Sequence, residues 1–335
     1  MHTNRTLLAA CLSGALLLLT GCSSNPHGPA EKYIIVAANT KVQYWQTALA
    51  GLNHAVAEMQ VKGEIQGPDG HDPQAEHDAF RRAIAEKPAG IMVSASDANI
   101  ISPDIDAAMQ AGIPVITMDS DAPSSKRLFF IGTDNYNAGV LGGDLAAKLL
   151  NGKGTVVIYR LPTQQNQKDR LSGYQAAFAA HPDIKVTQII DLQDQPDISG
   201  FAYDTTKKLL DTKTNVNAFV CLESRSCGGV ADAVSRAGLA GKTVIVAMDT
   251  DPETLDWMQK GVTSATIAQK PYTMGYFGAK LLGDLHLHPP APLINNWRDY
   301  GNAPVPTFVD TGSFIVDKSS LSSFMQQNKS ATSGQ

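Results

Sequence analysis

Five polar side chains that can each form paired hydrogen bonds follow short apolar runs of the sequence. Carboxylates, the glutamine amide and the arginine guanidinium are planar groups with donors or acceptors side by side. Such groups pair with neighbouring hydroxyls of a sugar or polyol. A site built from them rejects misplaced hydroxyls, because a buried unpaired hydroxyl costs about 1–3 kcal/mol. These residues are Asp119, Arg170, Glu223, Asp249 and Gln269.

Two aromatic residues, Tyr44 and Trp45, follow the first apolar run and complete this set. The C–H bonds of a pyranose form a weakly apolar face that packs on such rings. Each residue also has a purely structural interpretation, which the sequence leaves open. These interpretations are helix capping for Asp119 and Asp249, a core position for Trp45, a solvated charge for Arg170, pairing with Arg225 for Glu223, and backbone satisfaction for Gln269.

The elements that position these side chains alternate regularly along the chain. Short β-branched runs are separated by amphipathic stretches such as residues 46–59, whose apolar residues form one stripe at helical spacing. Apolar strands that alternate with helices predict parallel sheets covered on both faces. The predicted strands are 33–38, 90–94, 114–118, 128–132, 155–159, 186–190, 217–222, 243–248 and 264–269.

This alternation begins at residue 33 and begins again near residue 155, so we predict two sheets and two lobes. Ligands of parallel sheets bind at the carboxyl ends of the strands, so facing lobes enclose a cleft. After a predicted helix at 271–285, the Pro- and Asn-rich segment 286–306 predicts a surface excursion, and 308–317 predicts one strand. We expect residues 319–335 to end the chain as a frayed tail.

The first residues have the pattern of an export signal. Arg5 precedes an apolar run that ends at Leu19, which is too short to span a bilayer comfortably. The sequence Leu-Thr-Gly-Cys at 19–22 resembles the bacterial lipobox, in which the cysteine receives a diacylglyceryl group and becomes the new N-terminus. We therefore expect residues 1–21 to be a signal peptide, Cys22 to be lipidated and residues 22–31 to form a polar tether. An ordinary signal peptide with an incidental cysteine is the alternative.

Composition limits the remaining possibilities. The net charge of −5 and the scattered basic residues argue against a nucleic-acid partner. Of the four cysteines, Cys221 and Cys227 remain after the signal and the lipid site are set aside. Outside the cytoplasm such a pair tends to oxidise, so we predict a disulfide, with two buried thiols as the alternative.

Motifs of other protein classes are missing from the sequence. It contains no G-x-S-x-G elbow, no H-E-x-x-H and no P-loop, so we expect no enzymatic activity. The spacings predict neither a metal site nor a cofactor site. A lipid signal also occupies the position at which a two-lobed transcription regulator carries its helix-turn-helix.

Several stretches together resemble the ribose-binding-protein-like family of bacterial periplasmic solute receptors, which are type I, two-lobed proteins. They are PVITMDSDAP, FFIGTDNYNAG, DRLSGYQAAF, VIVAMDTDPE and SATIAQKPYTMG, and the similarity runs from about Lys32 to Lys318. The resemblance implies two doubly wound lobes joined by three hinge segments, near 131–134, 267–271 and 303–309. The implied lobes are 32–132 plus 270–304 and 133–269 plus 305–318.

The resemblance also implies roles for individual residues. Tyr44 and Trp45 fall on ring-stacking positions, and Asp119, Arg170, Asp249 and Gln269 fall on hydroxyl-binding positions. Ser120 stands where close ribose receptors have an arginine, and Glu223 stands where many members have an asparagine. Lys41 also becomes a candidate pocket residue, because IQGPDGHDPQAE together with MDSDA resembles the rhamnose and autoinducer-2 receptor branch.

The implied function is solute capture without chemistry. The departures make the pocket more acidic, so we expect a neutral monosaccharide or polyol in place of ribose. The lobes close on the ligand, and the receptor, expected to be a monomer, docks on a membrane permease served by an ATPase. The expected location is the periplasm or cell surface, with a lipid anchor as the only membrane attachment. The alternative is a sugar or autoinducer-2-like signal receptor that reports to a chemoreceptor or histidine kinase.

Overall fold

Two six-stranded sheets form the framework of the computed structural model, which describes residues 25–192, 195–212, 214–290 and 297–333. The first sheet has the order β11-β5-β4-β3-β1-β2, and all of its pairings are parallel. Its strands are β1 (Lys32–Val36), β2 (Lys62–Gln66), β3 (Gly90–Val93), β4 (Val115–Met118), β5 (Phe130–Gly132) and β11 (Phe308–Asp310).

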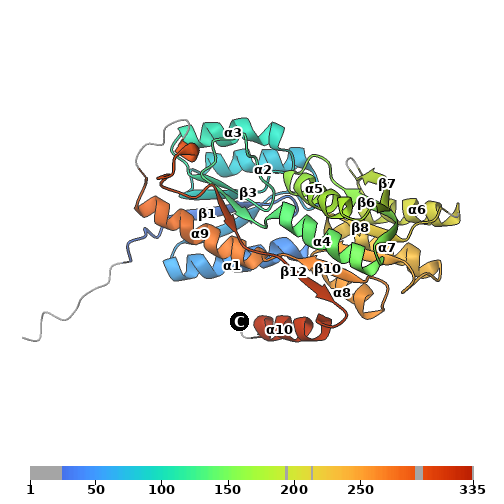
Figure 1. Ribbon diagram of the computed structural model, residues 1–335. Coiled ribbons are helices and arrows are strands. Elements are labelled where there is room, and N and C mark those ends of the chain that lie inside the picture. Colours follow the sequence, from blue (N-terminus) through green and yellow to red (C-terminus); the bar gives the residue numbers. More distant parts are fainter. Residues whose placement is uncertain (1–24, 193–194, 213, 291–296, 334–335) are drawn as a thin grey trace, which may run out of the picture.

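Helices cover both faces of this first sheet, as Figure 1 shows. Tyr33 and Ile35 pack toward α1 and α9, whereas Ile34 and Val36 pack toward α2 and α3. This alternation explains why β1 is apolar throughout its length, because each face of the strand is buried. The helices of this lobe are α1 (Gln43–Met59), α2 (Pro73–Ala85), α3 (Ala98–Gln110), α9 (Pro271–Leu287) and the short η1 (Trp297–Asp299).

The second sheet repeats the plan, with the order β12-β10-β9-β8-β6-β7 and only β12 antiparallel. Its strands are β6 (Lys153–Arg160), β7 (Asp183–Asp191), β8 (Ala218–Cys221), β9 (Val244–Met248), β10 (Ala265–Ala268) and β12 (Phe314–Asp317). Its helices are α4 (Asn135–Leu149), α5 (Gln165–Ala179), α6 (Ile198–Asp211), α7 (Ser224–Arg236), α8 (Pro252–Gln259) and α10 (Leu321–Ser333). The prediction of two parallel-sheet lobes is confirmed.

The chain crosses between the lobes three times, and the third crossing differs from the prediction. Residues 308–317 were expected to be one strand, and 305–318 were assigned to the second lobe. Instead β11 pairs with β5 of the first sheet, and β12 pairs with β10 of the second. Gly312 lies between them with φ +81°, a left-handed conformation that glycine adopts readily. The crossing therefore falls between Asp310 and Phe314.

The C-terminal residues also differ from the predicted tail. Residues 321–333 form helix α10, which packs on α8 and β12. Leu321 is buried there, and Phe324 and Met325 pack against the same small apolar cluster. Although the segment is mostly polar, its three apolar side chains have helical spacing and lie on the packed face of α10.

Candidate ligand-binding site

A cavity of about 80 Å³ lies between the two lobes at the carboxyl ends of their strands. Side chains from both lobes line it. Those predicted from the sequence are Tyr44, Trp45, Asp119, Arg170, Glu223, Asp249 and Gln269. The lining residues that the sequence analysis did not predict are Ala38, Asn39, Val42, His71, Leu161, Gln164, Asn166, Gln167, Ser224 and Arg225.

Asp119 and Asp249 occupy equivalent places in the two lobes. Each follows the last residue of a central strand, β4 or β9, within the repeated sequence Met-Asp-Ser/Thr-Asp. Their φ angles are +67° and +69°, a left-handed conformation that is uncommon outside glycine. Residues with strained backbone conformations of this kind are common at ligand-binding sites. The strand end thereby directs each carboxyl group into the space between the lobes.

Arg170 is held by three hydrogen bonds within the second lobe and its hinge. Its Nε donates to Asn135 at 2.9 Å, Nη1 donates to the Leu222 carbonyl at 2.8 Å, and Nη2 donates to Gln269 Oε1 at 3.0 Å. Helix α5 can bring the arginine this close because α4 has glycine at position 139. A Cβ there would lie 2.1 Å from the Arg170 carbonyl oxygen.

Gln269 connects the hinge to the cavity. It follows β10 at the second crossing, and its Oε1 accepts from Thr133 Oγ1 of the first crossing at 2.7 Å. Its Nε2 donates to Asp249 Oδ1 at 2.8 Å. One amide group therefore joins two crossing segments, Arg170 and one of the cavity carboxyl groups.

Burial dominates the electrostatics of the two carboxyl groups. It raises the pKa of Asp249 to about 7, with smaller upward contributions from Asp251 and Asp119 and an opposing one from Arg170. Burial also raises the pKa of Asp119, again against the effect of Arg170. A carboxyl group that titrates near neutrality can both donate and accept hydrogen bonds, and additional anions are disfavoured beside it. The cavity thus suits a neutral, hydroxylated ligand.

The aromatic pair borders the cavity from helix α1. Tyr44 and Trp45 are buried, and their ring centroids lie 5.4 Å apart in an edge-to-face arrangement. The Tyr44 hydroxyl donates to Asp119 Oδ1 at 2.8 Å. Trp45 therefore belongs to the apolar core of the first lobe and to the cavity wall at the same time.

Glu223 combines a structural contact with a cavity position. It caps α7, because its carboxylate accepts from the backbone N–H groups of Arg225 and Ser226, each at 2.8 Å. Cys221 and Cys227, which flank Glu223 in the sequence, form a disulfide with each other. The disulfide and the cap both restrain the loop that carries this carboxylate.

Two predicted residues lie outside the cavity lining. Lys41 is exposed and its Nζ lies 3.5 Å from Asp69, because the turn before α1 directs it to the surface. Ser120 is fully buried, and its hydroxyl donates to the Ala95 carbonyl at 3.0 Å. Ser120 is the neighbour of Asp119, so the left-handed turn that directs the aspartate inward sends the serine toward the backbone after β3.

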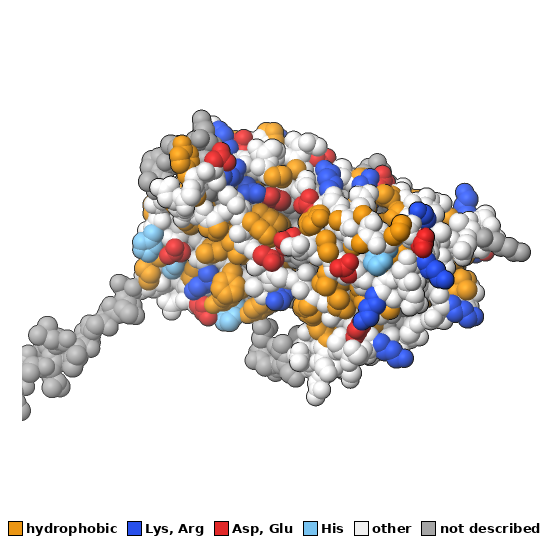
Figure 2. All heavy atoms as spheres, in the orientation of Figure 1, with side chains coloured by type: hydrophobic (Ala, Val, Ile, Leu, Met, Phe, Trp, Pro, Cys, Tyr) orange, Lys and Arg blue, Asp and Glu red, His pale blue; other side chains and the backbone are white. Residues whose placement is uncertain are grey.

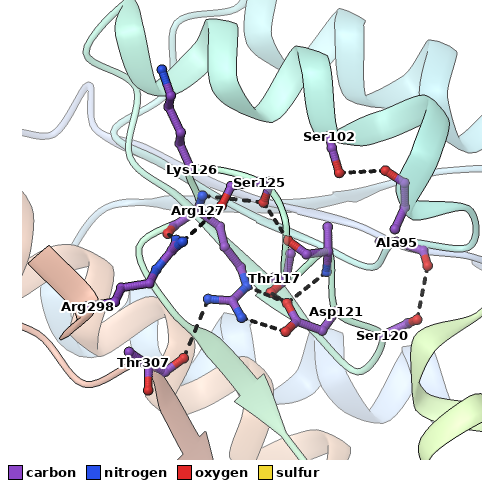
Figure 3. A network of polar contacts seen from close by, with 12 residues as sticks. Ala95, Ser102, Thr117, Ser120, Asp121, Ser125, Lys126, Arg127, Arg298 and Thr307 are labelled. Atoms are coloured by element: carbon purple, nitrogen blue, oxygen red, sulfur yellow. Dashed lines mark hydrogen bonds and ion pairs between the residues drawn. The ribbon is translucent and has the colours of Figure 1, made fainter. Parts of the chain in front are cut away.

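A polar network braces the loop that follows β4, and Figure 3 shows its central pair, Asp121 and Arg127. Asp121 forms an ion pair with Arg127 and accepts from the Thr117 hydroxyl at 2.6 Å. The guanidinium of Arg298, from the excursion after α9, donates to the Ser125 carbonyl at 3.1 Å and also to the Arg127 carbonyl. The network joins the loop after β4 to a segment far along the chain.

Polar residues near the predicted ones were missed by the sequence analysis. Asn39 follows β1 by three positions and caps the turn that leads into α1, so the strand-end rule would have found it. Asn166 lies in the first turn of α5, four residues before Arg170, and its side chain donates to Asp119 Oδ2 at 3.3 Å across the cleft. No local pattern distinguishes Asn166 from the three glutamines around it.

The lobes are in contact around this cavity. Besides the bond from Asn166 to Asp119, the Thr163 hydroxyl of the second lobe donates to the Ser96 carbonyl of the first at 2.8 Å. Thr163 lies in the loop between β6 and α5, and Asn166 lies in the first turn of α5. The structure therefore represents a closed arrangement of the two lobes.

Two facing lobes, three crossings and a cavity with polar lining between the lobes define a bilobed binding protein. A family model described as "Periplasmic binding protein domain" matches residues 33–286. The chain belongs to this family. Within the described ranges, no helix is both long and apolar enough to cross a membrane.

Three individual proteins show how similar this chain is to known sugar-binding proteins. The D-allose-binding periplasmic protein of Escherichia coli is 26% identical, covering 76% of this chain and 84% of the relative. A sugar-binding protein of a sugar ABC transporter from Bacillus halodurans is 34% identical with a TM-score of 0.78, covering 87% of this chain and 99% of that one. GanP, a glucose-galactose binding protein from Geobacillus stearothermophilus, is 28% identical with a TM-score of 0.78, over 87% of this chain and 99% of that one.

Proposed function

We propose that this protein is the substrate-binding component of an ABC importer and that it captures a neutral pentose, hexose or polyol between its lobes. The observation that carries the proposal is the hydrogen-bonded series Arg170–Gln269–Asp249, which faces Asp119 of the other lobe. These planar groups suit vicinal hydroxyls. The names of the allose-binding and glucose-galactose-binding relatives support the same ligand class.

The two-lobed arrangement suits a receptor that binds its ligand and does not convert it. Ligand contacts made by both lobes stabilise the closed form, which a permease in the membrane then recognises. The ligand is expected to be recovered unchanged from the purified protein. On the face shown in Figure 2, acidic and basic side chains are interspersed, so no field of a single sign selects a charged partner there.

A thermal-shift screen with neutral monosaccharides and polyols tests the proposal. A ligand at a hundredfold excess over its Kd stabilises the folded protein by about 2.7 kcal/mol. Asp249→Ala is expected to abolish the shift, whereas Asp256→Ala, at an exposed position on α8 in the same lobe, is expected to keep it. A shift that survives in Asp249→Ala would place the ligand elsewhere.

We also propose that Cys22 is lipidated, which anchors the protein to a bacterial membrane and places it in the periplasm or at the cell surface. Residues 1–21 and Cys22 lie outside the described residues, so the support is the lipobox-like sequence at 19–22. Cys22→Ser is expected to release the protein into the soluble fraction of cells. Continued membrane association of that variant would contradict the lipid anchor.

A further inference from the structure

Residues 25–31 are attached to the first lobe. Residues 22–31 were predicted to be a polar tether, but the described part, 25–31, packs on the protein. The Asn25 side chain donates to the Met59 carbonyl at the end of α1 at 2.7 Å. His27 Nδ1 lies 2.8 Å from Glu31 Oε2, and these two side chains are only 9% and 12% exposed. We call residues 25–31 the docked segment.

The docked segment lies at the amino edge of the first sheet, which is the end opposite the cavity. It leads directly into β1, whose first residue, Lys32, is in register with the first residue of the parallel strand β2. The C-terminal part of α9 packs against it. Gly283 of this helix is so close to His27 that a Cβ added to the glycine would lie 3.2 Å from His27 Cε1. Figure 1 shows the chain entering β1 at the end of this lobe remote from the second lobe.

Only three residue steps separate Cys22 from Asn25. A fully extended chain spans at most about 3.6 Å per residue, so the two are at most about 11 Å apart. A diacylglyceryl group on Cys22 sits in the bilayer, which places Asn25 within that distance of the lipid headgroups. The five residues of β1 then add about 17 Å between the amino edge and the cavity end of the lobe.

We propose that the amino edge of the first lobe, formed by the docked segment, the end of α1 and the end of α9, is the surface that faces the lipid bilayer. The proposal rests on the proposed lipidation of Cys22. The cleft then opens away from the membrane, and the second lobe is free to move. Lys32 at this edge is paired with Glu64 and Glu86, and the short chain after Cys22 holds the surface to the bilayer.

One consequence concerns delivery of the ligand. Turning the cleft toward the same membrane requires the docked segment to detach. The ten residue steps from Cys22 to Lys32 then extend to about 36 Å, about twice the length of β1, which gives the receptor room to reorient. The docked segment would thus separate a resting orientation from one that can reach a permease.

Fluorescence quenching in vesicles tests the orientation. The mature protein, lipidated at Cys22, is reconstituted in phosphatidylcholine vesicles that contain headgroup-quencher lipid, and a single dye is attached at Lys62→Cys or at Lys41→Cys. Lys62 is exposed at the amino edge, and Lys41 is exposed after the carboxyl end of β1 in the same lobe. We expect severalfold stronger quenching at position 62. Equal quenching, or stronger quenching at position 41, would overturn the proposal.

Two further preparations separate the possible causes. Twenty Gly/Ser residues inserted between Ser24 and Asn25 are expected to remove the difference, and a difference that persists would overturn the role of the short chain. A chain that begins at Cys22, joined selectively at this N-terminal cysteine to a thioester lipid, tests the orientation without natural lipidation. If natural Cys22 carries no lipid but the coupled protein shows the difference, only the anchoring proposal fails.

Discussion

The guanidinium of Arg170 donates to Gln269 Oε1 at 3.0 Å, which joins helix α5 of the second lobe to the crossing segment before α9. The same amide oxygen accepts from Thr133 of another crossing. A ligand bound at Arg170 therefore contacts a group that is continuous with the hinge.

Arg170→Lys is expected to weaken ligand binding at least tenfold, which is about 1.4 kcal/mol. Lysine is a point charge and cannot reproduce the three-way fork to Asn135, Leu222 and Gln269. Isothermal titration with a ligand from the thermal screen measures the effect. Lys168→Arg, at an exposed position on the same helix, is the control and is expected to bind normally. Unchanged affinity of Arg170→Lys would remove this residue from the site.

Thr163→Val is expected to favour the open form and to lower the apparent affinity severalfold. The substitution keeps the side-chain shape and removes the hydroxyl that bonds to Ser96 across the cleft. Small-angle X-ray scattering should report a larger radius of gyration for the ligand-bound variant. Thr163→Ser retains the hydroxyl and is expected to restore affinity. Equal affinity of the valine and serine variants would show that this bond does not support closure.

Glu76→Gln is expected to stabilise the protein increasingly as the pH rises from about 4.5 to about 8. Glu76 is 1% exposed, and burial raises its pKa to about 8. In this pH range the folded state keeps a proton that the unfolded state has lost, so wild-type stability falls as the pH rises. Glutamine removes this loss. Thermal unfolding at pH 5 and pH 9 measures it, and equal differences between variant and wild type at both pH values would contradict the burial argument.

Thiol titration of the denatured, non-reduced Cys22→Ser protein is expected to detect no reactive thiol from Cys221 or Cys227, because the two form a disulfide. Reduction is expected to lower stability by about 2 kcal/mol, the lower end of the usual range. It should also weaken ligand binding, because the disulfide flanks Glu223 in the cavity wall. Two reactive thiols before reduction would contradict the pairing.

Most of the candidate site was predictable because it follows from local pattern. A residue that follows a buried parallel strand must lie at the carboxyl edge of the sheet, and all such edges within a sheet coincide. Asp119, Asp249 and Gln269 satisfy this rule, and they line one cavity. Lys41 and Ser120 also follow strands, but position along the chain does not specify side-chain direction. The left-handed backbone conformation of Asp119, for example, directs the side chain of Ser120 away from the cavity and toward the Ala95 carbonyl.

The apolar runs, their alternation with helices and the polar residues at strand ends were sufficient to predict two lobes with a polar cleft, because burial periodicity is a local property. Three features depended on contacts between distant residues. They are the division of 308–317 between two sheets, the helix at 321–333, and the meeting of Asn166 with Asp119. Each requires partners more than forty positions away in the sequence, and the local sequence pattern does not indicate which distant residue the partner is. The contacts that stabilise these features form only when the distant segments pack together in the folded chain.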